Sequence, residues 1–273
     1  MTTRYGFVGR GRAARALAPL VAESEGATLA WWWSLGEPDG PATLGPVDVV
    51  VFAVPDGALE AAATSLSART GAAREIWLHL AGSRPGELLR TSAVVPRAAG
   101  CMHPLVALTG RPDRALLAGA TAGVDGEPDA LGPAEALARR LGLEPRRLVP
   151  GTKALYHAAA VTVAGHAVAL FAEGLALLGR CGLDPEAARA ALQPLMRGAV
   201  AHLADASPEQ AITGPITRGD ATTVAAHLAA LDALGDASAL ALYRELARRA
   251  LALSAPRLEP PARAAIDALL AEP

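Results

Sequence analysis

The sequence predicts an α/β protein, with a doubly wound parallel sheet at the N-terminus and an all-α C-terminal domain. Through the first half of the chain, short apolar runs alternate with helix-like segments, and a glycine-rich segment directly follows the first run. After Pro150-Gly151 the pattern is helical throughout. Strands that alternate with helices are typical of a parallel sheet covered on both faces. We therefore expect a nucleotide-binding type of domain at residues 1–150 and a helical domain at residues 151–273.

Apolar runs of strand length mark the expected strands. The run at 47–54 is continuous, which is typical of a strand buried on both faces. The expected strands are 4–8, 27–33, 47–54 and 75–80, followed by weaker candidates at 98–102, 117–124 and 147–149. The helices expected between them are 12–22, 58–68 and 133–141.

Helical periodicity and end signals mark the second domain. Gly182 ends a long helix at 153–180, and Asp184 with Pro185 supplies an N-cap and a first-turn proline for the next helix. The helices expected after the first are 185–203, 221–234, 238–253 and 261–270.

The longest apolar stretch, Ala158–Leu178, contains Gly165, His166 and Glu173. A membrane-spanning helix needs about 20 residues with few or no charges, so we expect a buried helix and no membrane partner. The long helix is also more apolar than a one-sided surface helix. This predicts a homodimer formed through the helical domain.

The composition excludes other partners. The 273 residues carry 25 Lys+Arg and 27 Asp+Glu, a net charge of -2, whereas nucleic-acid binding needs a basic face. The N-terminus lacks the apolar segment of a secretory signal, and two cysteines form no disulfide framework. We expect a cytoplasmic protein that binds no nucleic acid.

The segment Gly9-x-Gly11-x-x-Ala14 lies between an expected strand and a helix, which is the context of a dinucleotide-binding loop. Gly9 permits the tight turn, Gly11 lets the backbone approach a pyrophosphate, and Ala14 allows close packing of helix and strand. We include Arg10 and Arg12 among the cofactor-binding residues. The alternative is an ordinary strand-to-helix turn.

Ser34 ends the second expected strand, where an acid would favour NAD by binding the ribose 2′-hydroxyl. A small hydroxyl there, with the arginines of the glycine loop, favours the 2′-phosphate of NADP. Glu37, a little further on, would argue for NAD. We therefore expect NADP(H) rather than NAD(H), and we place Val54 and Pro55, at the end of the third expected strand, among the cofactor-binding residues.

Three consecutive tryptophans, Trp31, Trp32 and Trp33, end the second strand. Alternation along a strand places Trp32 on the face opposite the other two. Either these rings pack against small alanines, or they provide a wall for the adenine ring.

Lys153 is the one lysine in the chain, since every other basic residue is arginine. Arginine cannot replace lysine where a compact ammonium, or a proton that can leave, is needed. His157 lies one turn further along the same helix face, with Tyr156 close by. The three side chains predict a group that polarises a carbonyl and delivers a proton. The alternative is a lysine that caps or solvates the domain boundary.

Other candidate site residues follow strand ends or lie in a polar loop. His103 and Ser83 each follow an expected strand end, where a doubly wound sheet binds its ligands. Further on, Arg218 would hold a substrate carboxylate bidentately, with Thr213 and Asp220 in the same loop. The alternative is an Arg218–Asp220 pair that braces a tight turn, with Asp220 capping the following helix. Neither a Cys-x-x-Cys motif nor a close histidine pair is present, so we expect no metal site.

These segments resemble a known family. The glycine loop and residues 48–56 resemble the N-terminal domain shared by pyrroline-5-carboxylate reductases, 3-hydroxyisobutyrate dehydrogenases and ketopantoate reductases. Residues 101–104 (Cys-Met-His-Pro), 153–158 (Lys-Ala-Leu-Tyr-His-Ala) and 213–220 (Thr-Gly-Pro-Ile-Thr-Arg-Gly-Asp) resemble the Rossmann-like proteins that carry the domain of unknown function DUF2520. The resemblance covers nearly the whole chain. It implies an NADP-type fold with an all-helical C-terminal domain, often paired in a dimer.

The resemblance also implies roles for two segments. Hydroxyacid dehydrogenases and ketopantoate reductases of this superfamily use a lysine near the start of the interdomain helix, and Lys153 fits that place. The dehydrogenases usually have an asparagine four residues later, where this chain has His157, which is a departure from their mechanism. The loop at 213–220 is similar in placement to the substrate loop of pyrroline-5-carboxylate reductases, which lack the lysine.

The sequence therefore predicts an NADPH-dependent reductase that passes hydride to the C=O of a small oxo acid, with a ketopantoate-like substrate as the first choice. Lys153 polarises the oxygen, His157 or His103 assists, and Arg218 holds the carboxylate. The alternatives are an imine reductase of the pyrroline-5-carboxylate reductase type and a non-catalytic NADP(H)-binding sensor.

Overall fold

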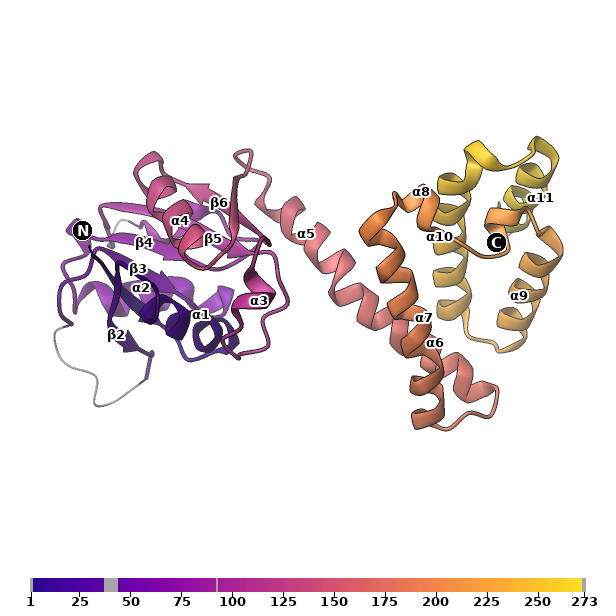
Figure 1. The fold of residues 1–273 in the computed structure, drawn as a ribbon, viewed down its shortest axis with the longest axis horizontal. Helices are drawn as coiled ribbons and strands as arrows, with labels where there is room; N and C mark the ends of the chain where they lie inside the picture. Colours follow the sequence, from indigo (N-terminus) through magenta and orange to yellow (C-terminus); the bar gives the residue numbers. More distant parts are fainter. Residues whose placement is uncertain (1, 37–43, 92, 272–273) are drawn as a thin grey trace. The chain divides into compact units, whose positions relative to one another are not determined.

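The computed structural model describes residues 2–36, 44–91 and 93–271 and divides into two compact units, Met1–His166 and Ala167–Pro273. The first unit is an α/β domain and the second is helical (Figure 1). The expected boundary at residue 150 falls between the last strand and helix α5, while the division into compact units falls later, within the long helical stretch.

Seven strands in the described residues form one sheet, in the order β2-β1-β3-β4-β5-β6-β7. They are β1 Thr3–Val8, β2 Ala27–Trp33, β3 Val49–Phe52, β4 Ile76–His79, β5 Ala98–Pro104, β6 Thr121–Gly126 and β7 Glu144–Arg147. Neighbouring strands are parallel except for β5 and β6. The expected parallel sheet is confirmed, with one antiparallel pair that the sequence pattern did not predict.

Helices cover both faces of the sheet, as a doubly wound fold requires. The core of one face contains residues of α1 and α4, and the core of the other contains residues of α2. The bounds are α1 Arg12–Ala22, α2 Leu59–Ser67, α3 Arg114–Leu117 and α4 Pro128–Arg140, with short 3₁₀ turns η1 Asp56–Ala58, η2 Ala72–Arg74 and η3 Gly86–Leu89. Because α1 and α2 lie on opposite faces, the connections that leave the neighbouring strands β1 and β3 diverge.

The three tryptophans of β2 alternate between the faces as expected. Trp33 belongs to one core and Trp31 packs against it, while Trp32 packs against the other core. Gly6 makes room for the Trp31 ring, since a Cβ there would lie 2.2 Å from a ring carbon. Trp32 lies at the glycine loop: its indole N–H donates to the carbonyl of Gly9, and the Arg10 guanidinium lies 4.6 Å from the ring centroid.

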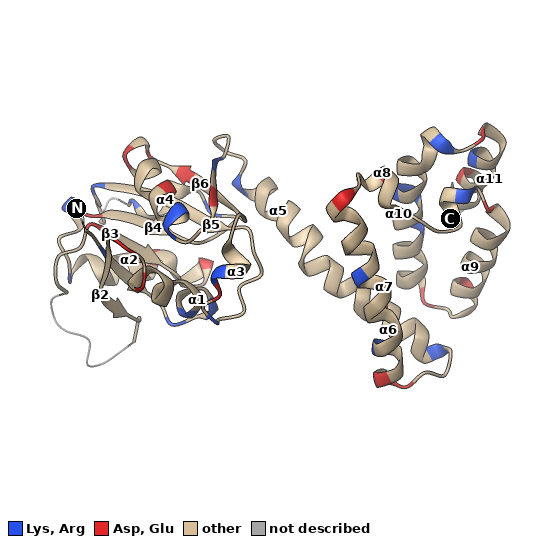
Figure 2. Ribbon diagram, in the orientation of Figure 1, with Lys and Arg blue, Asp and Glu red and all other residues tan. Residues whose placement is uncertain are grey.

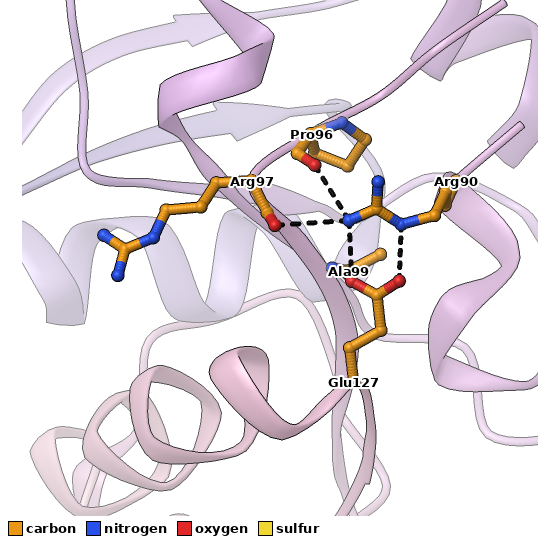
Figure 3. Close-up of polar contacts among 5 residues, drawn as sticks. All are labelled: Arg90, Pro96, Arg97, Ala99 and Glu127. Atoms are coloured by element: carbon orange, nitrogen blue, oxygen red, sulfur yellow. Dashed lines mark hydrogen bonds and ion pairs between the residues drawn. The ribbon is translucent and has the colours of Figure 1, made fainter.

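An ion pair joins Arg90, directly after η3, to Glu127, directly before α4 (Figure 3). The Arg90 guanidinium donates to both carboxylate oxygens of Glu127 and also to the carbonyls of Pro96 and Arg97, at 2.9 and 3.2 Å. One Glu127 oxygen accepts from the Ala99 N–H at 2.8 Å. The pKa of Glu127 is lowered, first by its hydrogen bond with Arg90. This pair holds the end of β6 beside the strand that carries the candidate site residues.

The expected long helix differs from the structure in two respects. It consists of α5 Lys153–Val163 and α6 Gly165–Arg180, which meet at Ala164. The expectation that the apolar stretch is buried is wrong for this chain alone: Lys153 is the one buried residue of α5, and α6 has none. Several large apolar side chains of these two helices are exposed, among them Leu155, Val163 and Val168. The homodimer that would cover them remains a prediction.

Helices α5 and α6 carry few charged side chains (Figure 2). The 28-residue stretch Lys153–Arg180 is long and apolar enough to cross a membrane, by length and composition only. Its first residue, however, is hydrogen-bonded inside the α/β unit, and its second half carries Glu173. We therefore keep the expectation that it does not span a membrane.

The second unit confirms the expected helical region, and its described residues contain no strand. Its further helices are α7 Pro185–Asp205, α8 Pro208–Ala211, α9 Ala221–Ala233, α10 Ala237–Ser254 and α11 Pro260–Ala271, with 3₁₀ turns η4 Ile216–Arg218 and η5 Ala255–Arg257. Asp184 and Asp236 cap α7 and α10 by accepting from backbone N–H groups. Val224 and Ile266 lie in its core, fully buried.

Candidate active site

A cavity of about 510 Å³ lies at the carboxyl ends of β1, β3 and β4, and we call it the switch-point cavity. In an open α/β sheet, ligands bind outside the carboxyl ends of the strands, where the strand order reverses. Here β2 lies on one side of β1 and β3 on the other. Its lining includes Gly11, Arg12, Val54, Pro55, Gly82, His103 and His157. Residues that are far apart in sequence thus meet at the position that the fold reserves for a ligand.

The glycine loop fits a pyrophosphate. Gly9 has φ +110, and a Cβ there would lie 2.4 Å from the carbonyl oxygen of Ala53, so the turn requires glycine. At Gly11 a Cβ would meet only that oxygen, at 3.8 Å, and would otherwise point into open space. Helix α1 begins directly afterwards with no side-chain cap among the described residues, which leaves its first N–H groups for an anion. Ala14 is fully buried, as close helix–strand packing requires.

Lys153 is buried at the start of α5 and binds two atoms of the α/β unit. Its ammonium donates to the carbonyl of Ala81 at 3.0 Å and to the sulfur of Cys101 at 2.8 Å. The Cys101 thiol donates to the same carbonyl at 3.3 Å. Burial raises the pKa of Cys101 to about 11, so the sulfur remains a neutral thiol. No carboxylate in the described residues forms an ion pair with Lys153, and an ammonium buried in this way is costly to the fold.

His79 binds the backbone N–H of Ala81, the residue whose carbonyl accepts from Lys153. Its Nδ1 accepts from the Ala81 N–H at 3.2 Å and its Nε2 lies 2.9 Å from the carbonyl of Pro85. A backbone N–H must donate and a carbonyl must accept, so the neutral ring carries its proton on Nε2. Burial lowers the pKa of His79 to about 4, which agrees with this assignment. Ala81 is therefore held through its N–H by His79 and through its carbonyl by Lys153.

His103, Tyr156 and His157 form a second cluster. The Tyr156 hydroxyl donates to the carbonyl of His103, accepts from the Gly123 N–H, and lies 3.3 Å from Nδ1 of His103. The rings of His103 and His157 are nearly perpendicular, with centroids 5.6 Å apart. Burial, and then the charges of Lys153 and His157, lower the pKa of His103 to about 4. His103 is therefore a neutral imidazole at physiological pH.

Gly82 lets the two histidines approach the switch-point cavity. A Cβ on Gly82 would lie 2.2 Å from Nδ1 of His157 and 2.8 Å from Nε2 of His103. Nδ1 of His157 is buried and has no hydrogen-bond partner in the part of the chain that the structure describes. A buried nitrogen without a partner, next to an open cavity, fits a site that receives a polar atom of a ligand.

The other expected site residues of the first unit lie elsewhere. The Ser83 hydroxyl donates to Asp56 at 3.0 Å and, like Lys153, lines a separate cavity of about 610 Å³. Ser34 follows the end of β2 and is half-buried. Glu37, which would have argued for NAD, lies outside the described residues.

Thr213, Arg218 and Asp220 belong to the second unit. Asp220 caps α9: its carboxylate accepts from the Thr223 N–H at 3.0 Å and from the Thr223 hydroxyl at 2.6 Å. Arg218 ends η4 and is exposed, and the described residues contain no ion pair between Arg218 and Asp220. The alternative is therefore confirmed for the cap and not for the bracing pair, and carboxylate binding by Arg218 remains a prediction.

The two neutral histidines predict a loss of stability in acid. His79 and His103 have folded-state pKa values of about 4, against 6.5 ordinarily. Between these values the unfolded chain binds more protons than the folded one, so the free energy of unfolding falls as the pH falls. At pH 5 each histidine should cost about 2 kcal/mol relative to pH 7. Urea unfolding at both pH values measures this loss.

The variant His79→Asn should reduce this acid-dependent loss of unfolding free energy by the part that His79 contributes, about 2 kcal/mol. Asn keeps a short acceptor for the Ala81 N–H but does not titrate. His202→Asn is the matched control, because His202 is exposed on α7. An acid-dependent loss of equal size in the wild type and in His79→Asn would contradict the assignment.

The fold and the switch-point cavity define a Rossmann-like α/β protein with a helical second unit. Residues 120–250 match the family model of DUF2520, described as a domain of unknown function. The chain therefore carries a DUF2520 domain, which begins with β6 and extends into α10. The expected family resemblance is confirmed. A comparison with the curated proteins gives no match.

Several solved structures share the fold. BF3122 of Bacteroides fragilis, provisionally named an NADP oxidoreductase, has a TM-score of 0.71 at 18% identity, over 91% of this chain and 98% of that one. Protein TM1727 of Thermotoga maritima has a TM-score of 0.70 at 21% identity, over 92% and 98%. Pyrroline carboxylate reductase of Plasmodium falciparum, solved with NADP bound, has a TM-score of 0.56 at 12% identity, over 92% and 98%. At these identities the comparisons show a common fold.

Proposed function

We propose that the protein is a nicotinamide-dependent reductase that converts the carbonyl group of an oxo acid to an alcohol, with NADPH as the preferred cofactor. The observation that carries the proposal is the switch-point cavity, which contains a glycine loop and two histidines in one space. A bound nicotinamide nucleotide would supply the hydride. NADP is named for BF3122 and is bound in the structure of the Plasmodium falciparum reductase, which supports the choice of cofactor.

The glycine loop and the first turn of α1 would bind the pyrophosphate, with Val54 and Pro55 lining the opposite wall. The 2′-phosphate would lie near Arg10, Arg12 and Ser34. Arg10 is held over the Trp32 ring and also donates to the carbonyl of Trp32 at 2.9 Å. An arginine ordered in this way, together with a small hydroxyl at the end of β2, supports NADP over NAD.

His103 and His157 would contact the carbonyl oxygen of the substrate. The neutral imidazole of His103 can donate a hydrogen bond to that oxygen and pass on a proton as the charge develops. Lys153 would supply the buried positive charge that stabilises the developing oxyanion. Its ammonium binds the carbonyl of Ala81, and the next residue, Gly82, lies against both histidines. In this proposal the histidines line the switch-point cavity, where the reaction would occur, and Lys153 lines the separate cavity of about 610 Å³.

The buried charge also bears on the alternative functions. An imine substrate reacts in its protonated form, which a nearby buried ammonium would disfavour. A sensor that only binds a nucleotide would have no use for a buried ammonium that forms no ion pair within the described residues. Both observations favour reduction of a carbonyl compound.

Two glycine variants test the binding of the cofactor. Gly11→Ala places a methyl group in open space, so it should unfold at the wild-type temperature yet lose the stabilisation by NADPH. For the wild type, NADPH at 100 times its Kd should add about 2.7 kcal/mol, or roughly 5–10 °C. Gly9→Ala should lower the unfolding free energy itself, by about 1–3 kcal/mol, because its φ is positive. Thermal unfolding with NADPH and NADH in parallel measures both effects.

An unchanged NADPH shift in Gly11→Ala would contradict pyrophosphate binding at this loop. A larger shift with NADH than with NADPH would contradict the NADP preference while leaving the loop assignment intact.

A further inference from the structure

A second cavity of about 550 Å³ adjoins the switch-point cavity, and we call it the apolar cavity. His103, Ala107 and His157 line both cavities. Its other walls come from the segment that follows His103 and from one side of α5. A volume of this size is typical of a small-molecule site.

The polar and the apolar residues that line the apolar cavity lie at different ends of it. Apart from His103, Tyr156 and His157, all of its lining residues are apolar, among them Leu105, Val106, Ala160, Val161 and Val163. The described residues that line it include no arginine, lysine, aspartate or glutamate. The polar atoms thus gather at the end that is shared with the switch-point cavity.

We infer that the apolar cavity binds an apolar side chain of the substrate, so that the preferred oxo acid carries a branched aliphatic substituent rather than a small or charged one. This inference rests on the proposed function. The carbonyl would lie at the shared histidines and the substituent would extend along α5 toward Ala160. The carboxylate would stay outside the apolar cavity, because a charge without a partner is costly to bury.

A series of oxo acids measures this selectivity. We would determine kcat/KM with NADPH for 2-oxopropanoate, 2-oxobutanoate, 2-oxopentanoate and 4-methyl-2-oxopentanoate. Each added carbon should raise kcat/KM about fourfold while it enters apolar surroundings. A flat series, or one that falls with size, would overturn the inference and leave the reductase proposal standing.

Two variants of α5 locate the effect. Ala160→Leu fills the apolar cavity from its wall, so it should lower kcat/KM for 4-methyl-2-oxopentanoate at least tenfold and leave 2-oxopropanoate nearly unchanged. Ala158→Leu adds the same group at an exposed position that does not line the cavity, and it should leave the whole series unchanged. Equal effects of the two variants would overturn the inference.

Calorimetry separates the inference from the proposed function. We would titrate 4-methyl-2-oxopentanoate into the full chain saturated with NADP⁺. Binding with a negative heat-capacity change, weakened by Ala160→Leu and not by Ala158→Leu, supports the apolar cavity even if no hydride is transferred. In that case the reductase proposal alone would fail. Absence of binding would overturn the inference.

Discussion

Replacing Lys153 by methionine should lower kcat about 10²- to 10³-fold and leave the protein at least as stable as the wild type. The ammonium binds a carbonyl and a thiol, and no carboxylate in the described residues forms an ion pair with it. An apolar side chain of similar length removes the cost of burying that charge. Steady-state kinetics and thermal unfolding of the same preparation measure the two effects.

Lys153→Arg is the informative companion variant. It keeps the charge, but the planar guanidinium does not fit the space between Ala81 and Cys101 as a compact ammonium does. We expect it to lose activity and also stability, while binding of NADPH is retained in both variants. A Lys153→Met protein that turns over at nearly the wild-type rate would remove Lys153 from the reaction. One that is less stable than the wild type would assign the residue to the fold instead.

Gly82→Ala should lower kcat about 10²-fold, because small displacements of positioned groups cost about that much. The new methyl group would occupy the space of the His157 ring and of the edge of His103. Both rings would have to move away from the switch-point cavity. Rate measurements at saturating NADPH, with nucleotide binding measured separately by thermal shift, test this expectation.

Gly71→Ala is the matched control for that variant. Gly71 has φ -85, and a Cβ there meets nothing within 4 Å. It should therefore leave kcat unchanged. If Gly82→Ala and Gly71→Ala were equally active, the two histidines would not be the groups that contact the substrate.

The sequence predicted the parallel part of the sheet well because those strands are continuous apolar runs. The run at 47–54 became β3, and its register with β1 brings Pro55 beside the glycine loop. The antiparallel pairing of β5 with β6 was missed. It depends on contact between two distant glycines: a Cβ on Gly126 would lie 2.5 Å from Cα of Gly100. Local periodicity carries no information about such a contact.

The candidate site, too, was predicted only where local sequence patterns carry the information. The spacing of Lys153 and His157 along one helix was visible in the sequence, and so was the position of His103 after a strand. The partners of Lys153 were not, because Ala81 contributes only a backbone carbonyl and nothing in the local sequence places Cys101 beside the start of α5. His79 and Gly82 were missed as well, since their roles depend on which residues the fold brings to the end of β4.

The contrast between the two cysteines makes the chain convenient for labelling. Cys101 is completely buried and its thiol stays protonated, whereas Cys181 is exposed just after α6. A thiol-reactive dye should therefore attach at a single place, in the helical unit, without mutagenesis. The four tryptophans, Trp31, Trp32, Trp33 and Trp77, all lie in the α/β unit. Energy transfer from indole to dye would then report whether nucleotide binding changes the distance between the two units.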